Sequence, residues 1–399
     1  MPSTLTSIQY DAFRECSSLT EIEIPAGVTS IANSTFYGCT NLTSITLPPN
    51  LTAIDAYAFS GCTSLTEFVI PNGVTSLNGT FYGCINLESM TIPNSVTSIG
   101  TSTFNDVKEN CELIFNTSQT TISKSGTNPF PQNSYKVKFT GTKIPTQDST
   151  TSLFNADSNL KEVTIANTVT AIPASAFKNC TGLSNGNITI PTSVTSIGTG
   201  AFDDIGNGLT LTFAGTGNQT LTAFDYPNNQ HKVVLGHGVP TNSSNASIFQ
   251  NDTYLTEVVY AGGPNLIANA FTGCSNLTTV TFTSYPTTIQ TTPLPDNVGT
   301  IIFAPKNEML IHDVSSLFNS SSGSVTFQFK NSADVGSLPP MITIRSDAFL
   351  GFGTSSSYQF DSAPDYYIYY ESSSCFPAGS TGTSGGTNYA WNSSTGAWQ

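Results

Sequence analysis

Eight cysteines are the residues of this sequence best suited to chemistry, because a thiolate can act as a nucleophile, a metal ligand or half of a disulfide. Six of them share one motif, three residues after a phenylalanine, at Cys16, Cys39, Cys62, Cys84, Cys180 and Cys274. No CxxC pair or neighbouring histidine accompanies them, so a zinc site lacks ligands at usable spacing. We interpret the six as a structural column of buried thiols that stack from one repeat to the next.

Disulfides remain an alternative, because neighbouring repeats would bring the thiols of such a column within bonding reach. Cys111 and Cys375 lie at the edge of the pattern or outside it, and they suit pairing better than the six. If the column consists of free thiols, Cys39→Ser buries a hydroxyl in an apolar site and costs about 1–3 kcal/mol. A reducing agent alone then has little effect.

The other groups able to do chemistry are few and dispersed. His231 and His237 lie on either side of an expected strand, which predicts that both are in loops at its two ends; the third histidine is His312. The stretch "DDIGNG" at Asp203 and Asp204 resembles a fragment of a calcium loop without its following acidic ligand, so a solvated turn is the better interpretation. No nucleophile elbow, P-loop or dinucleotide-binding motif occurs. We therefore predict a chain that is not an enzyme, with no catalytic residue, cofactor or metal.

Asn-x-Ser/Thr sequons are abundant, and in a eukaryotic source several would carry glycans. The sites that we expect to be glycosylated in that case are Asn33, Asn41, Asn50, Asn78, Asn116, Asn187, Asn242, Asn251 and Asn276. Further sequons stand at Asn179, Asn218, Asn245, Asn319 and Asn392.

The elements that position these residues form a repeat. Phenylalanines recur at steps of 22 or 23 residues, at Phe13, Phe36, Phe59, Phe81 and Phe104, and the cysteines keep the same steps. Two columns in one register are strong evidence for a repeat architecture. Each copy is too small to bury its own apolar face, so stacking must supply the core.

One repeat reads A-F-x-G-C-x-x-L-T-x-I-x-I-P-x-x-V-T-x-I. The alternation in "LTSITLP", with Leu42, Ile45 and Leu47 inward, predicts a short strand after each CxxL. A second short extended piece, "VTSI", follows. A proline cannot donate a ladder hydrogen bond, so the first strand should end at Pro25, Pro48, Pro71, Pro93 and Pro191.

Past Cys111 the motif decays while apolar strand marks persist. They stand at Leu113, Val137, Val163, Ile188, Leu211, Val233, Val258, Val280 and Ile301. Counting from Ile22 to Ile301 predicts about 13 coils of a mainly β solenoid, each adding ~4.8 Å. After "VTFQF" at Val325 the period tightens and disappears. We expect regular repeats over 1–115, degenerate repeats of the same solenoid over 116–345, and a C-terminal cap or attachment segment over 346–399.

The C-terminal segment contains "YYIYY" at 366–370, a Gly/Ser/Thr linker, and the two tryptophans of the chain. Trp391 and Trp398 flank the turn-like "NSSTG", which predicts a small aromatic hairpin.

Composition excludes several classes of protein. The formal net charge is −14 and the 12 basic residues are scattered singly, so nucleic acid is a poor partner. No apolar run approaches the roughly 18 residues that span a bilayer. The N-terminal stretch "MPSTLTSIQYDAF" lacks the pattern of a signal peptide and begins in mid-repeat. We therefore expect a processed product, a fragment, or a part that stacks on something else.

These repeats resemble the BspA-like leucine-rich repeats. The resemblance is specific over 5–104, recurs over 153–202 and 270–282, and is a strand rhythm elsewhere. It implies a leucine-rich-repeat type parallel β solenoid on secreted or surface proteins that bind host matrix or other cells. It supplies no catalytic residues.

Two functions follow as hypotheses. The first is a non-enzymatic extracellular or cell-surface recognition or adhesion protein, which binds protein or glycan through a polar sheet face at Thr43, Ser44, Thr46 and their equivalents. The second is a structural subunit of an extracellular filament, appendage or virion fibre, which associates end to end through open coils.

Overall fold

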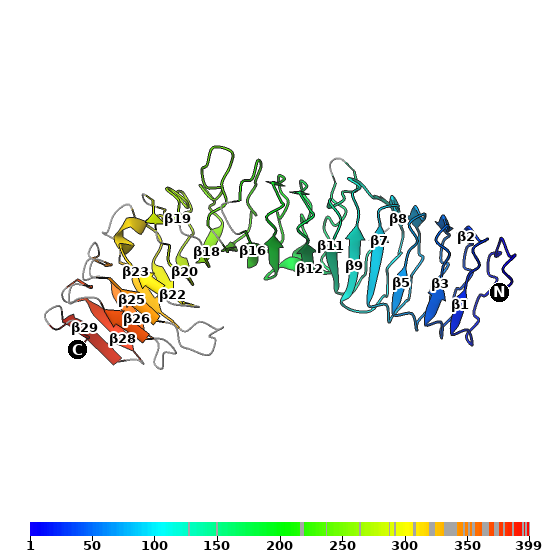
Figure 1. The fold of residues 1–399 in the computed structure, drawn as a ribbon, viewed down its shortest axis with the longest axis horizontal. Helices are drawn as coiled ribbons and strands as arrows, with labels where there is room; N and C mark the ends of the chain where they lie inside the picture. The colour runs from blue at the N-terminus through cyan, green and yellow to red at the C-terminus, as the bar shows by residue number, and fades with distance from the viewer. Residues whose placement is uncertain are drawn as a thin grey trace. The chain divides into compact units, whose positions relative to one another are not determined.

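The structure is a computed structural model of the chain. It describes all residues except 127, 149–150, 216–218, 237, 263–264, 287, 291–292, 306–308, 319–323, 331–340, 346–347, 350–351, 353–355, 361–366, 371–374, 378–379, 385–386, 393–394, 396 and 399. The chain forms two compact units, residues 1–207 and residues 208–399. Each unit is a parallel β solenoid, which confirms the predicted fold class (Figure 1).

In the first unit, every coil has one strand on the same side. These strands are β1 (Glu21–Glu23), β3 (Ser44–Thr46), β5 (Glu67–Val69), β7 (Ser89–Pro93), β9 (Cys111–Asn116), β11 (Tyr135–Phe139), β12 (Leu160–Ile165) and β14 (Asn187–Ile190). Of these, β1, β3, β5, β7 and β14 follow the CxxL motif as predicted, whereas β9, β11 and β12 form where the motif has decayed. β1 pairs with β3, and β5, β7, β9, β11 and β12 form a continuous parallel ladder. Their outward surface is called the sheet face below.

The prolines end these strands as expected, because each one begins a tight turn. The carbonyl oxygen of Pro25 accepts the N–H of Val28 at 3.0 Å, and that of Pro71 accepts the N–H of Val74 at 3.1 Å. A short second strand then forms the opposite side of every coil except that of β11, which has only isolated bridges at Thr146. These strands are β2 (Ser30–Ile31), β4 (Ala53–Ile54), β6 (Ser76–Leu77), β8 (Ser98–Gly100), β10 (Ser123–Ser125), β13 (Ala171–Ile172) and β15 (Ser196–Ile197).

The third side of the coil is the turn that carries the A-F-x-G-C motif. Its glycine has a left-handed backbone, with φ of 68° at Gly38 and 72° at Gly61, where a side chain would be strained. The N–H of Gly38 also donates to the carbonyl oxygen of Ser60 at 2.8 Å, which links successive turns. The motif therefore specifies a stacked turn.

Stacked phenylalanines form the core under that turn. The ring centroids of Phe36 and Phe59 lie 5.4 Å apart with 6° between their planes, and Phe59 to Phe81 and Phe81 to Phe104 measure 6.1 Å each. Phe68 reaches in from β5 and lies 4.8 Å from both Phe59 and Phe81. Each buried ring contributes roughly 1.5–3 kcal/mol, so the column of rings is a main source of stability.

The second unit repeats this arrangement. A parallel ladder runs through β16 (Leu209–Phe213), β17 (His231–Leu235), β18 (Leu255–Tyr260), β20 (Thr279–Phe282), β22 (Thr300–Phe303), β24 (Thr326–Phe329), β26 (Ser357–Phe360) and β28 (Thr381–Ser384). On the opposite side lie β19 (Asn265–Leu266), β21 (Thr288–Ile289), β23 (Met309–Ile311), β25 (Met341–Ile344) and β27 (Tyr367–Tyr370). Two short 3-10 helices interrupt the coils at η1 (Thr181–Leu183) in the first unit and η2 (Val314–Leu317) in the second.

The solenoid therefore continues past the point where the sequence period disappears. β26 pairs in parallel with β24, and β28 pairs in parallel with β26, although the sequence before β26 keeps only A-F-x-G and the complete A-F-x-G-C motif is absent. Aromatic stacking replaces the motif there: Phe329 lies on Phe360 at 4.8 Å, and Phe349 on Phe376 at 4.9 Å. The ladder turns antiparallel only at β29 (Thr387–Asn392) and β30 (Ala397–Trp398), where Trp391 pairs with Trp398 in the expected hairpin.

Candidate interaction surface

The repeated cysteines form a hydrogen-bonded ladder inside the solenoid. Each thiol donates to the carbonyl oxygen of the motif phenylalanine, or its equivalent, one coil earlier: Cys39 to Phe13 at 3.0 Å, Cys62 to Phe36 and Cys84 to Phe59 at 3.2 Å, and Cys180 to Phe154 and Cys274 to Phe249 at 2.9 Å. Burial raises the pKa of Cys39 to about 11 and that of Cys84 to about 12. These thiols stay protonated at neutral pH, so they are poor nucleophiles and poor metal ligands.

The prediction of burial is wrong for Cys16, which is exposed because no coil lies over it in the structure. Cys111 and Cys375 are buried, and all eight cysteines are free thiols. The Cys375 thiol donates to the carbonyl oxygen of Ile344 at 3.4 Å, which resembles the ladder of the motif cysteines. The structure therefore gives no support to a disulfide at either of the two.

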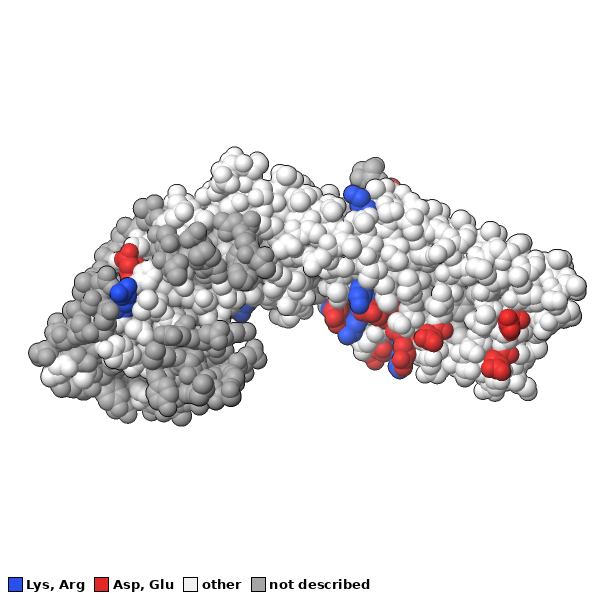
Figure 2. Space-filling view, viewed as in Figure 1, with Lys and Arg blue, Asp and Glu red and all other residues white. Residues whose placement is uncertain are grey.

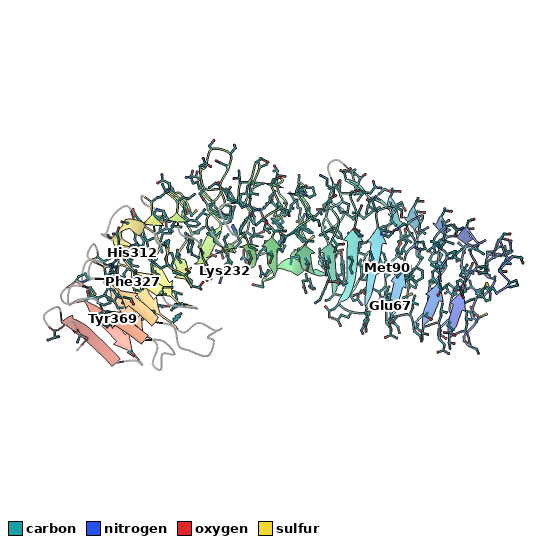
Figure 3. All side chains as sticks on the ribbon, in the orientation of Figure 1. Glu67, Met90, Lys232, His312, Phe327 and Tyr369 are labelled. Atoms are coloured by element: carbon teal, nitrogen blue, oxygen red, sulfur yellow. The ribbon has the colours of Figure 1, made fainter. Side chains whose placement is uncertain are left out.

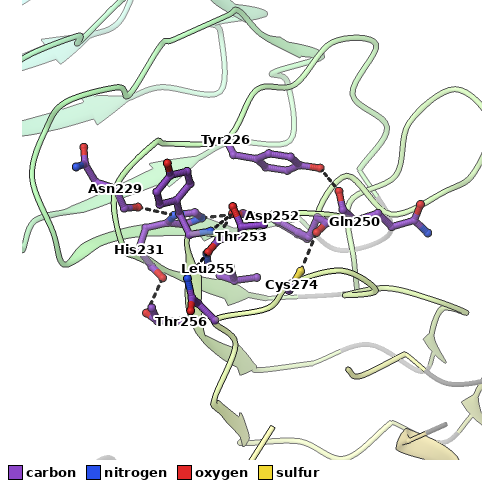
Figure 4. A network of polar contacts seen from close by, with 12 residues as sticks. Tyr226, Asn229, His231, Gln250, Asp252, Thr253, Leu255, Thr256 and Cys274 are labelled. Carbon is purple, nitrogen blue, oxygen red and sulfur yellow. Dashed lines mark hydrogen bonds and ion pairs between the residues drawn. The ribbon is translucent and has the colours of Figure 1, made fainter. Parts of the chain in front are cut away.

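His231 is buried at the first position of β17, so the prediction that it lies in a loop is wrong. Its Nδ1 lies 3.0 Å from the carbonyl oxygen of Asn229, and its Nε2 lies 3.0 Å from Oδ2 of Asp252 (Figure 4). The second contact is within ion-pair distance, but its geometry is not that of a hydrogen bond. Oδ1 of Asp252 accepts the N–H groups of Tyr254 and Leu255 at 3.1 Å each. Both side chains are held inside the coil, away from any substrate.

The first unit contains an equivalent pair. Tyr135 opens β11, as His231 opens β17, and its hydroxyl donates to Oδ2 of Asp157 at 2.7 Å. Asp157 follows Phe154 by three residues and Asp252 follows Phe249 by three, which is the position of the cysteine in the regular coils. In these two coils an aspartate replaces the thiol, and a polar side chain from the strand one coil earlier contacts it. Both pairs are therefore structural.

The remaining candidate groups do not converge. The ring of His312 packs edge-on against Tyr285 at 5.5 Å, and His237 lies outside the described residues. Asp203 and Asp204 occupy a surface turn, as predicted, and Asp204 lies 3.9 Å from Lys178. Within the described parts of the chain, no group of three or more His, Cys, Asp or Glu side chains could hold a metal ion. The same residues contain no helix long and apolar enough to cross a membrane.

Eight of the nine sequon asparagines that we singled out are exposed, and Asn242 is half-buried. Some of their side chains already link coils. Nδ2 of Asn41 donates to the carbonyl oxygen of Ser17 at 2.7 Å, and Nδ2 of Asn276 donates to that of Thr253 at 2.7 Å. Asn218 and Asn319 lie outside the described residues. Exposure permits a glycan at these sites, and glycosylation itself stays a prediction.

The sheet face of the first unit presents two regular rows of outward side chains. One row of outward residues comprises Glu21, Ser44, Glu67, Ser89, Glu112, Lys136 and Glu162. The second row comprises Glu23, Thr46, Val69, Thr91, Ile114, Lys138 and Thr164. In Figure 2 the coloured side chains of this unit gather along the side on which these strands lie.

This surface is more charged than the sequence analysis expected. Ser44 and Thr46 are exposed as predicted, but the Thr43 hydroxyl donates to the carbonyl oxygen of Thr20 at 3.0 Å. Lys136 pairs with Glu162 at 2.8 Å. In the stretch 1–126, which the structure describes without a gap, the exposed Glu21, Glu23 and Glu67 form no ion pair (Figure 3 shows Glu67).

Two adjoining hollows interrupt the sheet face near its acidic end. One, of about 440 Å³, is lined by Ile45, Thr46, Leu47, Pro49, Val69, Ile70, Pro71 and Asn72. The other, of about 400 Å³, is lined by Met1, Glu21, Ile22, Glu23, Ser44 and Thr46. Thr46 lines both, so an apolar hollow and an acidic one lie on the two sides of β3.

The coil geometry defines a solenoid of the leucine-rich-repeat class, with one parallel strand per coil on the sheet face and a stacked motif turn behind it. The chain belongs to the family described as "BspA type Leucine rich repeat region", whose model matches residues 1–109, 77–205, 147–278 and 242–361. This confirms the resemblance inferred from the motif.

Three solved structures are similar to the chain. A leucine rich cell surface protein from Faecalibacterium prausnitzii is 22% identical, with 83% of this chain and 78% of that chain covered and a TM-score of 0.30. A leucine-rich repeat protein from Bacteroides ovatus is 17% identical, with 86% and 92% covered and a TM-score of 0.26. The pneumococcal vaccine antigen PcpA is 15% identical, with 77% and 89% covered and a TM-score of 0.23. None of the curated proteins compared with the chain matches it.

Proposed function

We propose that the chain is a non-enzymatic recognition or adhesion protein of a cell surface or the extracellular space, and that the sheet face of the first unit binds its partner. The observation that supports this most is the sheet face itself, where parallel strands present two rows of exposed and half-exposed charged, hydroxyl and aliphatic side chains. The backbone that carries these side chains is held by parallel strand pairing, so little backbone freedom is lost on binding. A rigid face of this kind suits a macromolecular partner.

The buried chemistry supports the same proposal. The thiols, His231 and Asp252 are used inside the coils, and burial raises the pKa values of the thiols. A catalytic site needs a nucleophile or an acid and base that a substrate can reach. The family membership agrees with a surface role, because the resemblance implies surface proteins that bind matrix or other cells.

A pair of matched double variants tests the proposal. Thr91 and Thr164 are exposed on the sheet face, whereas Ser30 and Ser76 are exposed on the opposite strands. The labelled full chain is applied to cultured cells and to arrays of immobilised matrix proteins and glycans. Thr91→Lys with Thr164→Lys should weaken any binding at least tenfold, and Ser30→Lys with Ser76→Lys should leave it within twofold.

Equal binding by the two double variants would place the contact elsewhere and overturn the proposal. Electron microscopy of the chain at high concentration separates it from the filament hypothesis. Regular polymers joined end to end, without binding to any cell or array, would favour the structural subunit.

A further inference from the structure

The apolar hollow on the sheet face lies where the backbone ladder between two coils is interrupted. The N–H of Thr43 donates to the carbonyl oxygen of Thr20 at 2.9 Å, and that of Glu88 to Thr66 at 2.8 Å. In residues 1–126, all of which the structure describes, the equivalent bond between Thr66 and Thr43 is not formed. β3 and β5 are thus neighbours that do not pair.

A second rung is missing on the far side of the same gap. Ile24 donates its N–H to the carbonyl oxygen of Thr46 at 2.9 Å, but in this fully described stretch Leu47 makes no such bond to Val69, and Ile70 makes none to Thr91 although β5 and β7 pair. The backbone N–H of Leu47 and the carbonyl oxygen of Val69 thus have no backbone partner. The motif turns of these coils remain joined, since Gly38 still bonds Ser60. The gap is a local opening of the sheet between two stacked coils.

The opening is lined by apolar side chains that water can reach. Val69 is 80% exposed, and Ile45 and Leu47 are half-exposed. An exposed aliphatic side chain on an otherwise polar sheet face gains free energy when a partner covers it. The hollow of about 440 Å³ has room for one large side chain from that partner.

The rim of the opening determines the charge of the partner. Glu21 and Glu23 line the adjoining hollow on the other side of β3, and Glu67 lies outside both hollows at the start of β5, on the same outward side as Val69. These three exposed carboxylates form no ion pair within residues 1–126. Lysine or arginine side chains complement them, whereas the phosphates of nucleic acid or anionic lipid are repelled. No aromatic ring lines either hollow, so stacking on a sugar is not provided.

We propose that this opening is a docking site for an extended, basic segment of a partner protein, which inserts an apolar side chain between β3 and β5 and places lysine or arginine side chains on Glu21, Glu23 and Glu67. The backbone of the segment can bond the free N–H of Leu47 and the free carbonyl of Val69, as an added strand does. This inference rests on the proposed function and specifies where on the sheet face the partner binds and what its chemistry is.

The test uses synthetic ten-residue peptides with a fluorescent label, and fluorescence anisotropy with the full chain. One peptide alternates lysine with leucine; in two analogues, alanine replaces leucine or glutamate replaces lysine. We expect the lysine–leucine peptide to bind at least tenfold more tightly than either analogue, because the opening needs both the cation and the apolar side chain.

Three variants of the chain separate docking from attraction to its net negative charge. Val69→Asp adds a carboxylate, so simple electrostatic attraction would strengthen binding, whereas loss of the apolar wall should weaken it at least fivefold. Glu67→Lys should also weaken binding at least fivefold. Glu109→Lys changes the net charge by the same amount on an exposed turn away from the opening and should leave binding within twofold.

The proposal is overturned if Val69→Asp binds the peptide as well as the unaltered chain, or if the two charge reversals weaken binding equally. It is also overturned if the lysine–alanine peptide binds as tightly as the lysine–leucine peptide. The cell and array assay distinguishes this failure from failure of the proposed function. If binding is lost with Thr91→Lys and Thr164→Lys but kept with Val69→Asp, the proposal that the sheet face binds the partner stands and only the proposed docking site is overturned.

Discussion

Nε2 of His231 lies 3.0 Å from Oδ2 of Asp252, and both side chains are almost completely buried. Asp252 occupies the cysteine position of its coil, and His231 occupies the position of Leu209 and Leu255 in the paired strands. The two positions at which this coil departs from the repeat, 231 and 252, are therefore in contact with each other. Without His231, Oδ2 of this buried aspartate would lose the polar side chain that lies beside it, so the two changes depend on each other.

This dependence predicts a strong coupling between the two positions. Asp252→Cys should destabilise the second unit by about 1–3 kcal/mol, because it leaves the buried His231 ring without the carboxylate and the N–H groups of Tyr254 and Leu255 without Oδ1. His231→Leu combined with Asp252→Cys restores the regular coil and should recover most of that loss. Urea unfolding of the single and double variants measures the coupling. Strictly additive effects would show that the two residues do not act as a pair.

The thiol ladder predicts that serine is a better replacement for a motif cysteine than valine. Cys62→Ser keeps a donor for the carbonyl oxygen of Phe36, so its cost should be about 1 kcal/mol or less. This cost is below the range of about 1–3 kcal/mol that the sequence alone predicts for a cysteine-to-serine change, because the thiol-to-carbonyl hydrogen bond was not predicted. Cys62→Val removes this bond, so the Phe36 carbonyl keeps only the N–H of Cys39, and it adds bulk in the core, which should cost about 1–3 kcal/mol. Thermal unfolding ranks the two, and the opposite order would contradict the ladder.

Free thiols also predict a defined pattern of alkylation. At pH 8 an excess of iodoacetamide should modify one cysteine per native chain, the exposed Cys16, and all eight after denaturation. Peptide mass mapping identifies the modified residue. A reducing agent should leave the melting temperature unchanged, and a drop on reduction would indicate disulfides.

Burial of the thiols predicts a loss of stability at alkaline pH. The pKa of Cys39 is raised from 9.0 to about 11, and that of Cys180 to about 12, chiefly because burial disfavours the thiolate. The unfolded chain therefore releases these protons first, and stability that is complete below pH 9 declines as pH rises toward 11–12. The urea midpoint at pH 9.5 should therefore be lower than at pH 8. At pH 9.5 tyrosines are still largely protonated, so the change reports on the thiols. An unchanged midpoint would contradict the burial of the thiols.

The phenylalanine column predicts a large cost for a single truncation. Phe59 contacts Phe36, Phe68 and Phe81, so Phe59→Ala removes three ring contacts and leaves a cavity. The expected loss is about 3–5 kcal/mol by urea unfolding. Tyr57→Ala, at an exposed neighbouring position, is the control and should cost far less.

The repeat, its strands and its proline turns could be predicted because each is written in a short local pattern. Phe36, Cys39 and Pro48 recur in register, and each has a single structural role. The coils after Phe329 could not be predicted in this way, because Phe360 and Phe376 pack by aromatic contact without the motif.

The candidate surface was only partly predictable for a different reason. The carboxylates were visible in "EIEIP" and "EFVIP", where Glu21, Glu23 and Glu67 alternate with apolar residues. The position of Asp252 three residues after Phe249 was also visible, and it would have indicated a buried aspartate. The opening between β3 and β5 has no sequence signal, because it depends on the separation of two strands whose own patterns are regular.

The most direct test of the account is a hydroxyl-radical footprint of the full chain, free and bound to the cell or matrix component that it captures. We predict protection of outward residues of the sheet face, with Val69 and Thr91 among them, and none at Ser30 and Ser76 on the opposite strands. Protection confined to those opposite strands, or to the second unit, would contradict the claim that the sheet face of the first unit is the recognition surface.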